Sequence, residues 1–269
     1  MRVRNLLALS LAFPWTLAAQ SSAVSETRDG VMAAFENFAS IYGGRLIAAF
    51  DSIPAKQYNY RPTPSQQSIG YIAQHLENAN YGLCERLGAL KHRRSAKDSL
   101  ADTVKSKWPK DTLIARLKAS LAFCDTALAG IAKLDDAPRA STLVGIETDL
   151  AEHYAQISGY MRQLGMLPPT ALPVKQRTAI SLPASALPAY AGVYEIGPGF
   201  QIIVTMENGA LFGRSTHGGA AVRLWPERRD EFFVKEVDAQ IMFTRDANRA
   251  VTGLVLHQYS RDRPGKKIR

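Results

Sequence analysis

The first two thirds of the chain space their hydrophobic residues as amphipathic helices do. Between residues 28 and 50, for example, apolar side chains recur at steps of three and four, which places them on one helical face. Similar stripes, bounded by residues that start or stop helices, predict four helices over residues 28–50, 65–87, 109–128 and 141–164. Pro138 is expected to break the chain before the last of these helices, and Val144 falls on the apolar side of that helix. Four amphipathic helices are typical of a bundle.

After Tyr190 the hydrophobic pattern changes to a period of two, which is typical of short strands. Asn208-Gly209 is a strong hairpin signal, because both residues tolerate left-handed backbone angles. No helical pattern separates the strands, which excludes parallel β-α-β organisation. We expect six to eight strands in a small antiparallel barrel or sandwich, with runs over residues 190–196, 200–206, 210–214, 222–225, 231–234, 240–244 and 251–258.

A proline-rich segment separates these two patterns. Residues 167–186 contain four prolines and show little periodicity, as expected of a semi-rigid linker. The sequence therefore predicts an α+β protein of two domains, with a four-helix bundle over residues 25–166 and an antiparallel β domain over residues 187–269.

The first residues have the composition of a secretion signal. Two arginines precede an apolar core at residues 6–17, and small residues follow it. This core is shorter than the ~20 residues that span a bilayer, which disfavours a retained anchor. We expect residues 1–20 to be a signal peptide cleaved after Ala19 or Ala23, and the mature protein to be periplasmic or secreted without a membrane span.

The net charge of +9 raises the question of an acidic partner such as nucleic acid. Export argues against nucleic acid. The densest basic run, residues 91–94, has no interleaved aromatics, and Lys266, Lys267 and Arg269 fall on what we expect to be a frayed C-terminus. We therefore expect a solvated basic surface and no nucleic-acid partner.

The two cysteines, Cys84 and Cys124, both fall within predicted helices. In an oxidising compartment, an even number of cysteines on neighbouring helices favours a disulfide. A pair of inert buried thiols is the alternative, because a bridge needs Cα atoms within ~7 Å of each other.

Three side chains of the predicted bundle could hold a metal ion. His75 falls on the second helix, while Asp149 and His153 fall one turn apart on the fourth, so that they share one face. Two imidazoles and a carboxylate would leave open positions for water or substrate. The alternative is that the histidines make ordinary hydrogen bonds and Asp149 faces solvent.

Two stretches of the bundle carry a family resemblance. One is Tyr58-Asn-Tyr-Arg-Pro-Thr-Pro64 followed by Ser68-Ile-Gly-Tyr-Ile-Ala-Gln-His75. The other is Glu152-His-Tyr-Ala-Gln-Ile-Ser-Gly-Tyr-Met-Arg-Gln-Leu-Gly-Met-Leu-Pro-Pro169. Both are similar to motifs of the DinB-like proteins, a family of four-helix bundles that includes bacillithiol transferases.

The resemblance implies a divalent metal, commonly zinc or nickel, held by three histidines. Two of these positions fall on His75 and His153, and the third falls on Asp149, which departs from the family pattern. A carboxylate ligand is compatible with zinc and also admits manganese or iron. It could equally mark a site that has lost its metal.

The β domain has a resemblance of its own. Leu187-Pro-Ala-Tyr-Ala-Gly-Val-Tyr194 and Val251-Thr-Gly-Leu-Val-Leu256 are similar to the lipocalin-like domain that follows some penicillin-recognising serine hydrolases. The chain itself contains neither G-x-S-x-G nor S-x-x-K, so the sequence offers no nucleophilic serine motif.

Two functions follow as expectations. The first is an exported metal-dependent transferase or hydrolase, in which the metal activates a thiol or water to attack a small substrate. The second is a non-catalytic exported protein that binds a small molecule and has a degenerate metal site. Homodimers are common among bundles and form a further expectation. The sequence assigns no catalytic residue. Tyr71, Tyr81 and Tyr154 lie near the three candidate metal ligands in sequence and could orient a substrate, although aromatic residues at helical spacing are more often part of the core.

Overall fold

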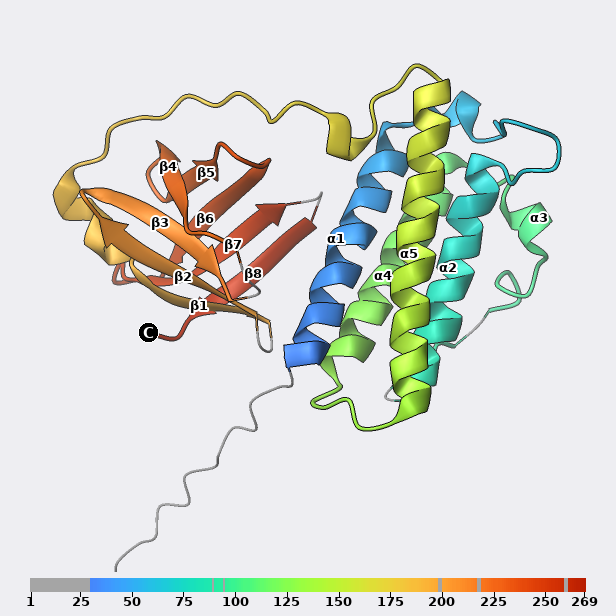
Figure 1. Ribbon diagram of the computed structural model, residues 1–269, viewed down its shortest axis with the longest axis horizontal. Coiled ribbons are helices and arrows are strands. Elements are labelled where there is room, and N and C mark those ends of the chain that lie inside the picture. Colours follow the sequence, from blue (N-terminus) through green and yellow to red (C-terminus); the bar gives the residue numbers. More distant parts are fainter. Residues whose placement is uncertain (1–29, 89, 94, 198–199, 217–218, 259–260) are drawn as a thin grey trace, which may run out of the picture.

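The computed structural model describes residues 30–269 except 89, 94, 198–199, 217–218 and 259–260. The predicted signal peptide at residues 1–20 lies outside the described part of the chain. The chain folds into an N-terminal helical domain and a C-terminal β-barrel, which confirms the α+β expectation (Figure 1). The helices are α1 (Gly30–Ser52), α2 (Ile69–Arg86), α3 (Asp102–Lys105), α4 (Lys110–Ala129) and α5 (Ala137–Gln163).

Local capping sets where the longer helices begin. The Ser68 side chain accepts a hydrogen bond from the backbone N–H of Tyr71, and Asp136 caps α5 in the same way. The helix α5 therefore begins four residues before the predicted start at residue 141. The reason is that Pro138, which we read as a break, lies in the first turn of the helix, where no backbone donor is needed.

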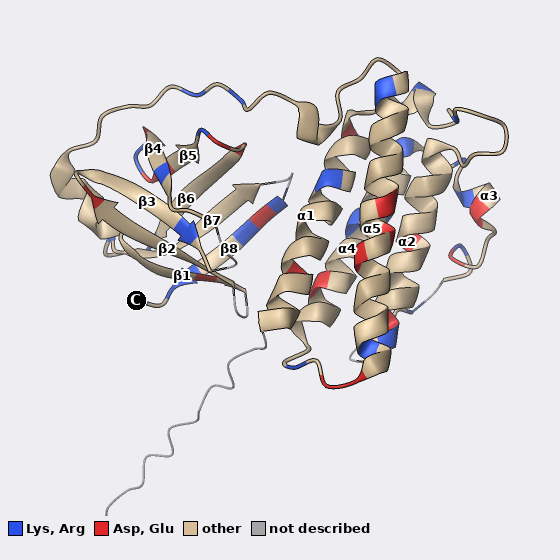
Figure 2. Cartoon of the chain, viewed as in Figure 1, with Lys and Arg blue, Asp and Glu red and all other residues tan. Residues whose placement is uncertain are grey.

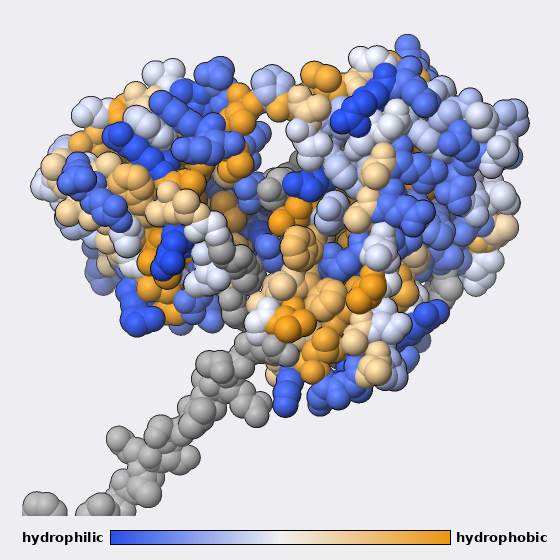
Figure 3. Space-filling view, viewed as in Figure 1, coloured by the Kyte–Doolittle hydropathy of each residue, from blue (hydrophilic) through white to orange (hydrophobic). Residues whose placement is uncertain are grey.

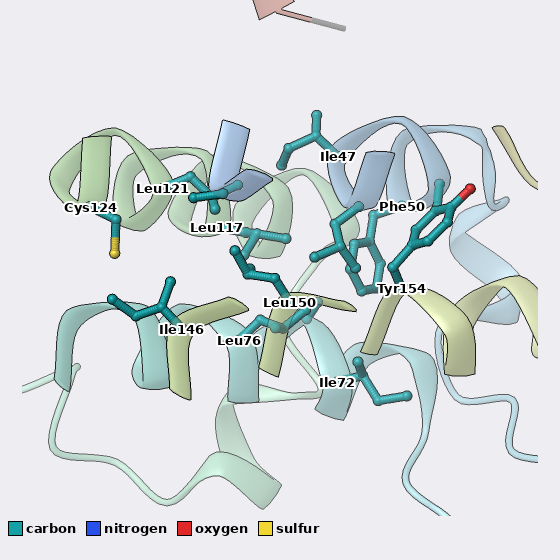
Figure 4. Packing of buried hydrophobic residues seen from close by; sticks show 14 of the residues in the cluster. Ile47, Phe50, Ile72, Leu76, Leu117, Leu121, Cys124, Ile146, Leu150 and Tyr154 are labelled. Atoms are coloured by element: carbon teal, nitrogen blue, oxygen red, sulfur yellow. The ribbon is translucent and has the colours of Figure 1, made fainter. Parts of the chain in front are cut away.

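The bundle core lies where α1, α2, α4 and α5 meet. In Figure 4 the apolar side chains of these helices point toward one another, among them Phe50, Leu76, Leu117 and Leu150, and all four are nearly inaccessible to solvent. The prediction that Val144 lies on the apolar side of its helix was wrong, since this side chain is half exposed. Because α5 packs against both α1 and α2, the tertiary contacts rather than the sequence stripe define its buried face.

The structure joins Cys84 of α2 to Cys124 of α4 by a disulfide. The two Cα atoms lie 5.3 Å apart, within the range that a disulfide spans. Both cysteines are buried in the bundle core. The bridge therefore ties two core helices together from the inside.

The C-terminal domain is a closed barrel in which each strand pairs antiparallel with the next and β8 returns to β1. Closure leaves no unpaired edge. Asn208 and Gly209 have positive φ angles of 48° and 73° at the β2–β3 turn, which confirms the predicted hairpin. The strands are β1 (Gly192–Gly197), β2 (Phe200–Glu207), β3 (Ala210–Ser215), β4 (Val222–Arg228), β5 (Glu231–Val234), β6 (Ala239–Arg245), β7 (Val251–Gln258) and β8 (Arg261–Lys267).

The last strand corrects the expectation of a frayed C-terminus. Lys266 and Lys267 belong to β8, which pairs with both β7 and β1 and closes the barrel. The hydrophobic pattern missed this strand because it consists entirely of charged residues, proline and glycine. Its ladder hydrogen bonds depend on two neighbouring strands rather than on its own hydrophobicity.

Polar and charged side chains connect the barrel to the bundle. Arg261 of β8 forms a salt bridge with Asp125 of α4, and its guanidinium also donates to the Ser40 hydroxyl of α1. The segment that connects the domains contains two short 3-10 helices, η2 (Pro169–Ala171) and η3 (Ala184–Tyr190), and runs from the bundle to the far end of the barrel (Figure 1). Among the described helices, none combines the length and apolar character needed to cross a membrane.

Candidate metal centre

The three predicted ligands come together at the α2–α5 contact. His75 projects from α2, and Asp149 and His153 project from consecutive turns of α5. The Nε2 atom of His75 lies 3.5 Å from Oδ1 of Asp149, and Nδ1 of His153 lies 3.3 Å from the same oxygen. The two imidazole rings are 4.9 Å apart between centroids. The carboxylate therefore lies within reach of both histidines.

The three side chains of the cluster differ in how much of each is exposed to solvent. The His153 side chain is 11% exposed, Asp149 is 19% exposed and His75 is 35% exposed. Solvent, and any small molecule, therefore reaches the cluster from the His75 side, while His153 is held within the bundle.

The electrostatics of the cluster keep Asp149 ionised. Burial by itself raises the pKa of the Asp149 carboxyl, but hydrogen bonds and charge interactions with His153 and His75 outweigh burial and bring that pKa to about 2. For His153, burial lowers the pKa and the contacts with Asp149 raise it, with a net rise. At neutral pH the cluster thus has a fixed negative charge beside two nitrogen ligands.

The backbone selects the tautomer of His153. Its Nδ1 atom lies 2.8 Å from the backbone carbonyl oxygen of Asp149, closer than it lies to the carboxylate. With the proton on Nδ1 donated to this carbonyl, Nε2 carries the lone pair. In metal sites, a hydrogen bond from the ring nitrogen that does not bind the metal orients the histidine ligand.

The donor set fits a divalent ion. One candidate ligand atom from each residue lies within 4.8 Å of the other two. For tetrahedral coordination at ~2.1 Å, ligand atoms are separated by about 3.4 Å, close to the 3.5 Å between His75 and Asp149. The second carboxylate oxygen of Asp149 is buried and has no hydrogen-bond partner among the described residues. A buried oxygen of this kind calls for a cation or a donor.

The nearby tyrosines and glutamate have other partners. Tyr81 stacks on His92, with ring centroids 3.6 Å apart, and the Tyr154 hydroxyl donates to Thr170. Glu77 forms a salt bridge with Arg116 of α4. The backbone N–H of Tyr71 completes the cap of α2. Among the described residues, no contact joins these four side chains to the histidine–aspartate cluster.

Sequence reasoning missed Glu147, which lies two residues before Asp149 on α5. Burial raises the pKa of its carboxyl to about 8, although a backbone hydrogen bond with Ala39 of α1 acts in the opposite direction. Its Oε2 atom is buried without a hydrogen-bond partner among the described residues. The sequence alone contained no sign of this, because the burial comes from the packing of α1 on α5.

Comparison with known families gives two matches. Residues 43–157 match the sequence model of the DinB superfamily, and this segment contains His75, Asp149 and His153. Residues 176–267 match the domain of unknown function DUF3471, and this segment contains all eight strands of the barrel. A comparison with curated proteins found no match. The chain therefore carries a DinB superfamily domain followed by a β-barrel, while the lipocalin-like relationship of that barrel is not confirmed by these matches.

Proposed function

We propose that this DinB superfamily domain binds one divalent metal ion through His75, Asp149 and His153, and that the protein acts outside the cytoplasm on a small substrate. The observation that carries the proposal is the Asp149 carboxylate between two imidazoles, with one buried oxygen that has no hydrogen-bond partner in the described part of the chain. Two nitrogen ligands favour zinc or nickel, and the carboxylate also admits manganese or iron.

Such an ion, when bound, would lower the pKa of a coordinated thiol or water so that a nucleophile forms near neutral pH. The chain supplies the remaining requirements. Asp149 contributes one negative charge, His153 is oriented by the backbone carbonyl, and the partly exposed His75 leaves one side of the cluster accessible. This arrangement supports a transferase or hydrolase in which the open positions face solvent.

Export influences the choice of nucleophile. The proposed signal peptide would deliver the chain to an oxidising compartment, and the Cys84–Cys124 disulfide is compatible with that destination. A cytosolic thiol is scarce there. Water is therefore the nucleophile we favour for a periplasmic or secreted enzyme of this kind.

A second candidate function is non-catalytic binding of a small molecule by the barrel. It is supported by the up-and-down order of eight strands in a closed barrel, which is also the topology of lipocalins. A lipocalin-like relationship of the barrel is part of this second proposal.

Elemental analysis after reconstitution tests the metal proposal. We expect about one equivalent of zinc or nickel in the wild-type protein, and a loss of most of it in His75→Ala and His153→Ala. His257→Ala is a matched control, because His257 also pairs with an aspartate, at 2.6 Å from Asp262, but lies in the barrel. Equal metal content in all four proteins, or no metal in any of them, would contradict the proposal.

A further inference from the structure

The two ends of the barrel interior are filled differently. At the end covered by η3, the rings of Tyr190, Tyr194, Phe232 and Phe243 pack as tilted and edge-to-face pairs with centroids 4.8 to 5.4 Å apart. The Tyr190 hydroxyl donates to Asp230 at the β4–β5 turn. This end of the barrel is closed by aromatic packing.

The opposite end, which faces α1, contains a cavity of about 360 Å³. Its walls are the buried apolar side chains of five strands, and Ile41 of α1 lies at its mouth. Figure 3 shows a hollow between the two domains that is bordered by both hydrophobic and hydrophilic residues. Protein interiors are close-packed, and cavities of a few hundred Å³ with apolar walls are the size of small-molecule sites. The apolar wall residues include Phe200, Ile202, Val222, Leu224, Ile241 and Leu256.

Three charged side chains line this cavity, namely Arg214, Glu236 and Arg263. Arg214 and Glu236 are exposed, so Arg263 is the most buried of the three. Along β8, Arg261, Arg263 and Lys267 are half-buried, while the residues between them, such as Asp262 and Lys266, are exposed. The Arg263 guanidinium lines the cavity and lies 4.4 Å from the centroid of the Phe200 ring. Its position is thus fixed by an aromatic wall residue.

The charge on Arg263 is poorly compensated by the protein. Burial lowers the pKa of this guanidinium, and the opposing effect comes from the charge of Glu36 on α1. Among the described residues, no carboxylate lies within salt-bridge distance of Arg263, whereas Arg261 two residues earlier pairs with Asp125. A partly desolvated guanidinium is a strong partner for a carboxylate, which it can bind through two hydrogen bonds.

We propose that the barrel cavity binds a small amphipathic anion, with its apolar body against Ile202, Leu224 and Ile241 and its carboxylate on Arg263. The site is distinct from the metal centre, which lies between α2 and α5 of the other domain. It gives the second domain a function of its own, whether the first is an enzyme or not.

Fluorescence titration with two matched probes tests this proposal. Anilinonaphthalene sulfonate is anionic, and phenylnaphthylamine has the same aromatic frame without the charge. We expect saturable binding of the anionic probe to the purified protein, and its displacement by decanoate but not by decanol at the same concentration. This comparison needs no variant, so it does not depend on any substitution folding.

Three variants locate the site. Arg263→Gln should weaken binding of the anionic probe at least tenfold, about 1.4 kcal/mol, because a charge-assisted contact is lost. Lys266→Gln removes the same charge from the exposed side of the same strand and should leave binding unchanged. Val222→Trp places a large ring at the cavity wall and should abolish binding of both probes, with circular dichroism to check the fold.

Three outcomes would overturn the proposal. Equal affinities of Arg263→Gln and Lys266→Gln for the anionic probe would show that Arg263 does not recognise the anion. Failure of decanoate to displace the probe from the wild-type protein, or unchanged binding by a folded Val222→Trp variant, would show that the cavity is not the site. His75→Ala serves to separate this site from the metal centre, because it should leave probe binding unchanged.

Discussion

His75 Nε2 lies 3.5 Å from Asp149 Oδ1, and this contact joins α2 to α5 across the surface of the bundle. The same oxygen lies 3.3 Å from His153, so a single carboxylate holds both imidazoles. The proposed cation site therefore depends on Asp149, and Asp149 is the position at which the chain departs from the three histidines that the resemblance to DinB-like proteins implies.

Asp149→Asn should weaken zinc binding by about 100-fold or more. The asparagine has nearly the same size but lacks the charge, and losing even an indirect contact to a metal ligand costs 10–100-fold in affinity. Competition with a chromophoric chelator measures the change. The exposed neighbour Glu152→Gln is the charge-matched control. Asp149→His, which restores three imidazoles, should keep the affinity, and an Asn variant as tight as the wild type would exclude Asp149 as a ligand.

Glu147→Gln should stabilise the protein at pH 8 and leave its stability nearly unchanged at pH 4. Burial raises the pKa of the Glu147 carboxyl from 4.5 to about 8 in the folded state. The folded state therefore keeps its proton where the unfolded state has lost it, and stability falls as pH rises between these two values. Thermal unfolding of both proteins from pH 4 to 9 measures this difference. If the difference in stability between the two proteins does not change with pH, the Glu147 carboxyl does not have the raised pKa.

Replacing both Cys84 and Cys124 by serine should lower the free energy of unfolding by about 4 kcal/mol, the chain-entropy value for a closed loop of 40 residues. Urea unfolding of the oxidised wild type and of the double variant measures the change. A reducing agent should destabilise the wild type and leave the double variant unaffected. Free thiols in the oxidised wild-type protein, detected by a thiol reagent after unfolding, would contradict the bridge.

Arg261→Asp should loosen the docking of the barrel on the bundle. The substitution replaces the salt bridge with Asp125 by a repulsion at a partly buried interface. We expect a larger radius of gyration in solution scattering and several-fold faster proteolysis within residues 167–186. The swapped pair Arg261→Asp with Asp125→Arg should restore both measurements. If neither measurement changes in Arg261→Asp, the ion pair does not hold the domains together.

Expression in a bacterial host with a secretory pathway should yield a mature chain that begins after Ala19 or Ala23. The apolar core at residues 6–17 and the small residues that follow it form the expected cleavage region. Intact-mass measurement of the periplasmic and cytoplasmic fractions locates the new N-terminus. An uncleaved chain confined to the cytoplasm would contradict export and would restore cytosolic thiols as cosubstrates.

The local features of the fold could be predicted because they depend on residues close together in the chain. The apolar stripes, the Ser68 cap and the Asn208-Gly209 turn each satisfy nearby backbone groups or form one face of one element. The same local rules misjudged Pro138 and missed β8. Proline is tolerated in the first turn of a helix, and β8 pairs with its neighbours without a hydrophobic pattern.

The sequence by itself determined the two domains, most of their helices and strands, and the three residues of the candidate metal centre, the last by spacing and resemblance. Only the tertiary structure decided that Asp149 lies between His75 and His153, that Glu147 is buried against α1, and that Arg263 lines a cavity of the barrel. The periodicity of hydrophobic residues and the residue types that form turns are properties of a short segment. Distances between side chains on different elements, and the loss of water around them, depend on how those elements pack.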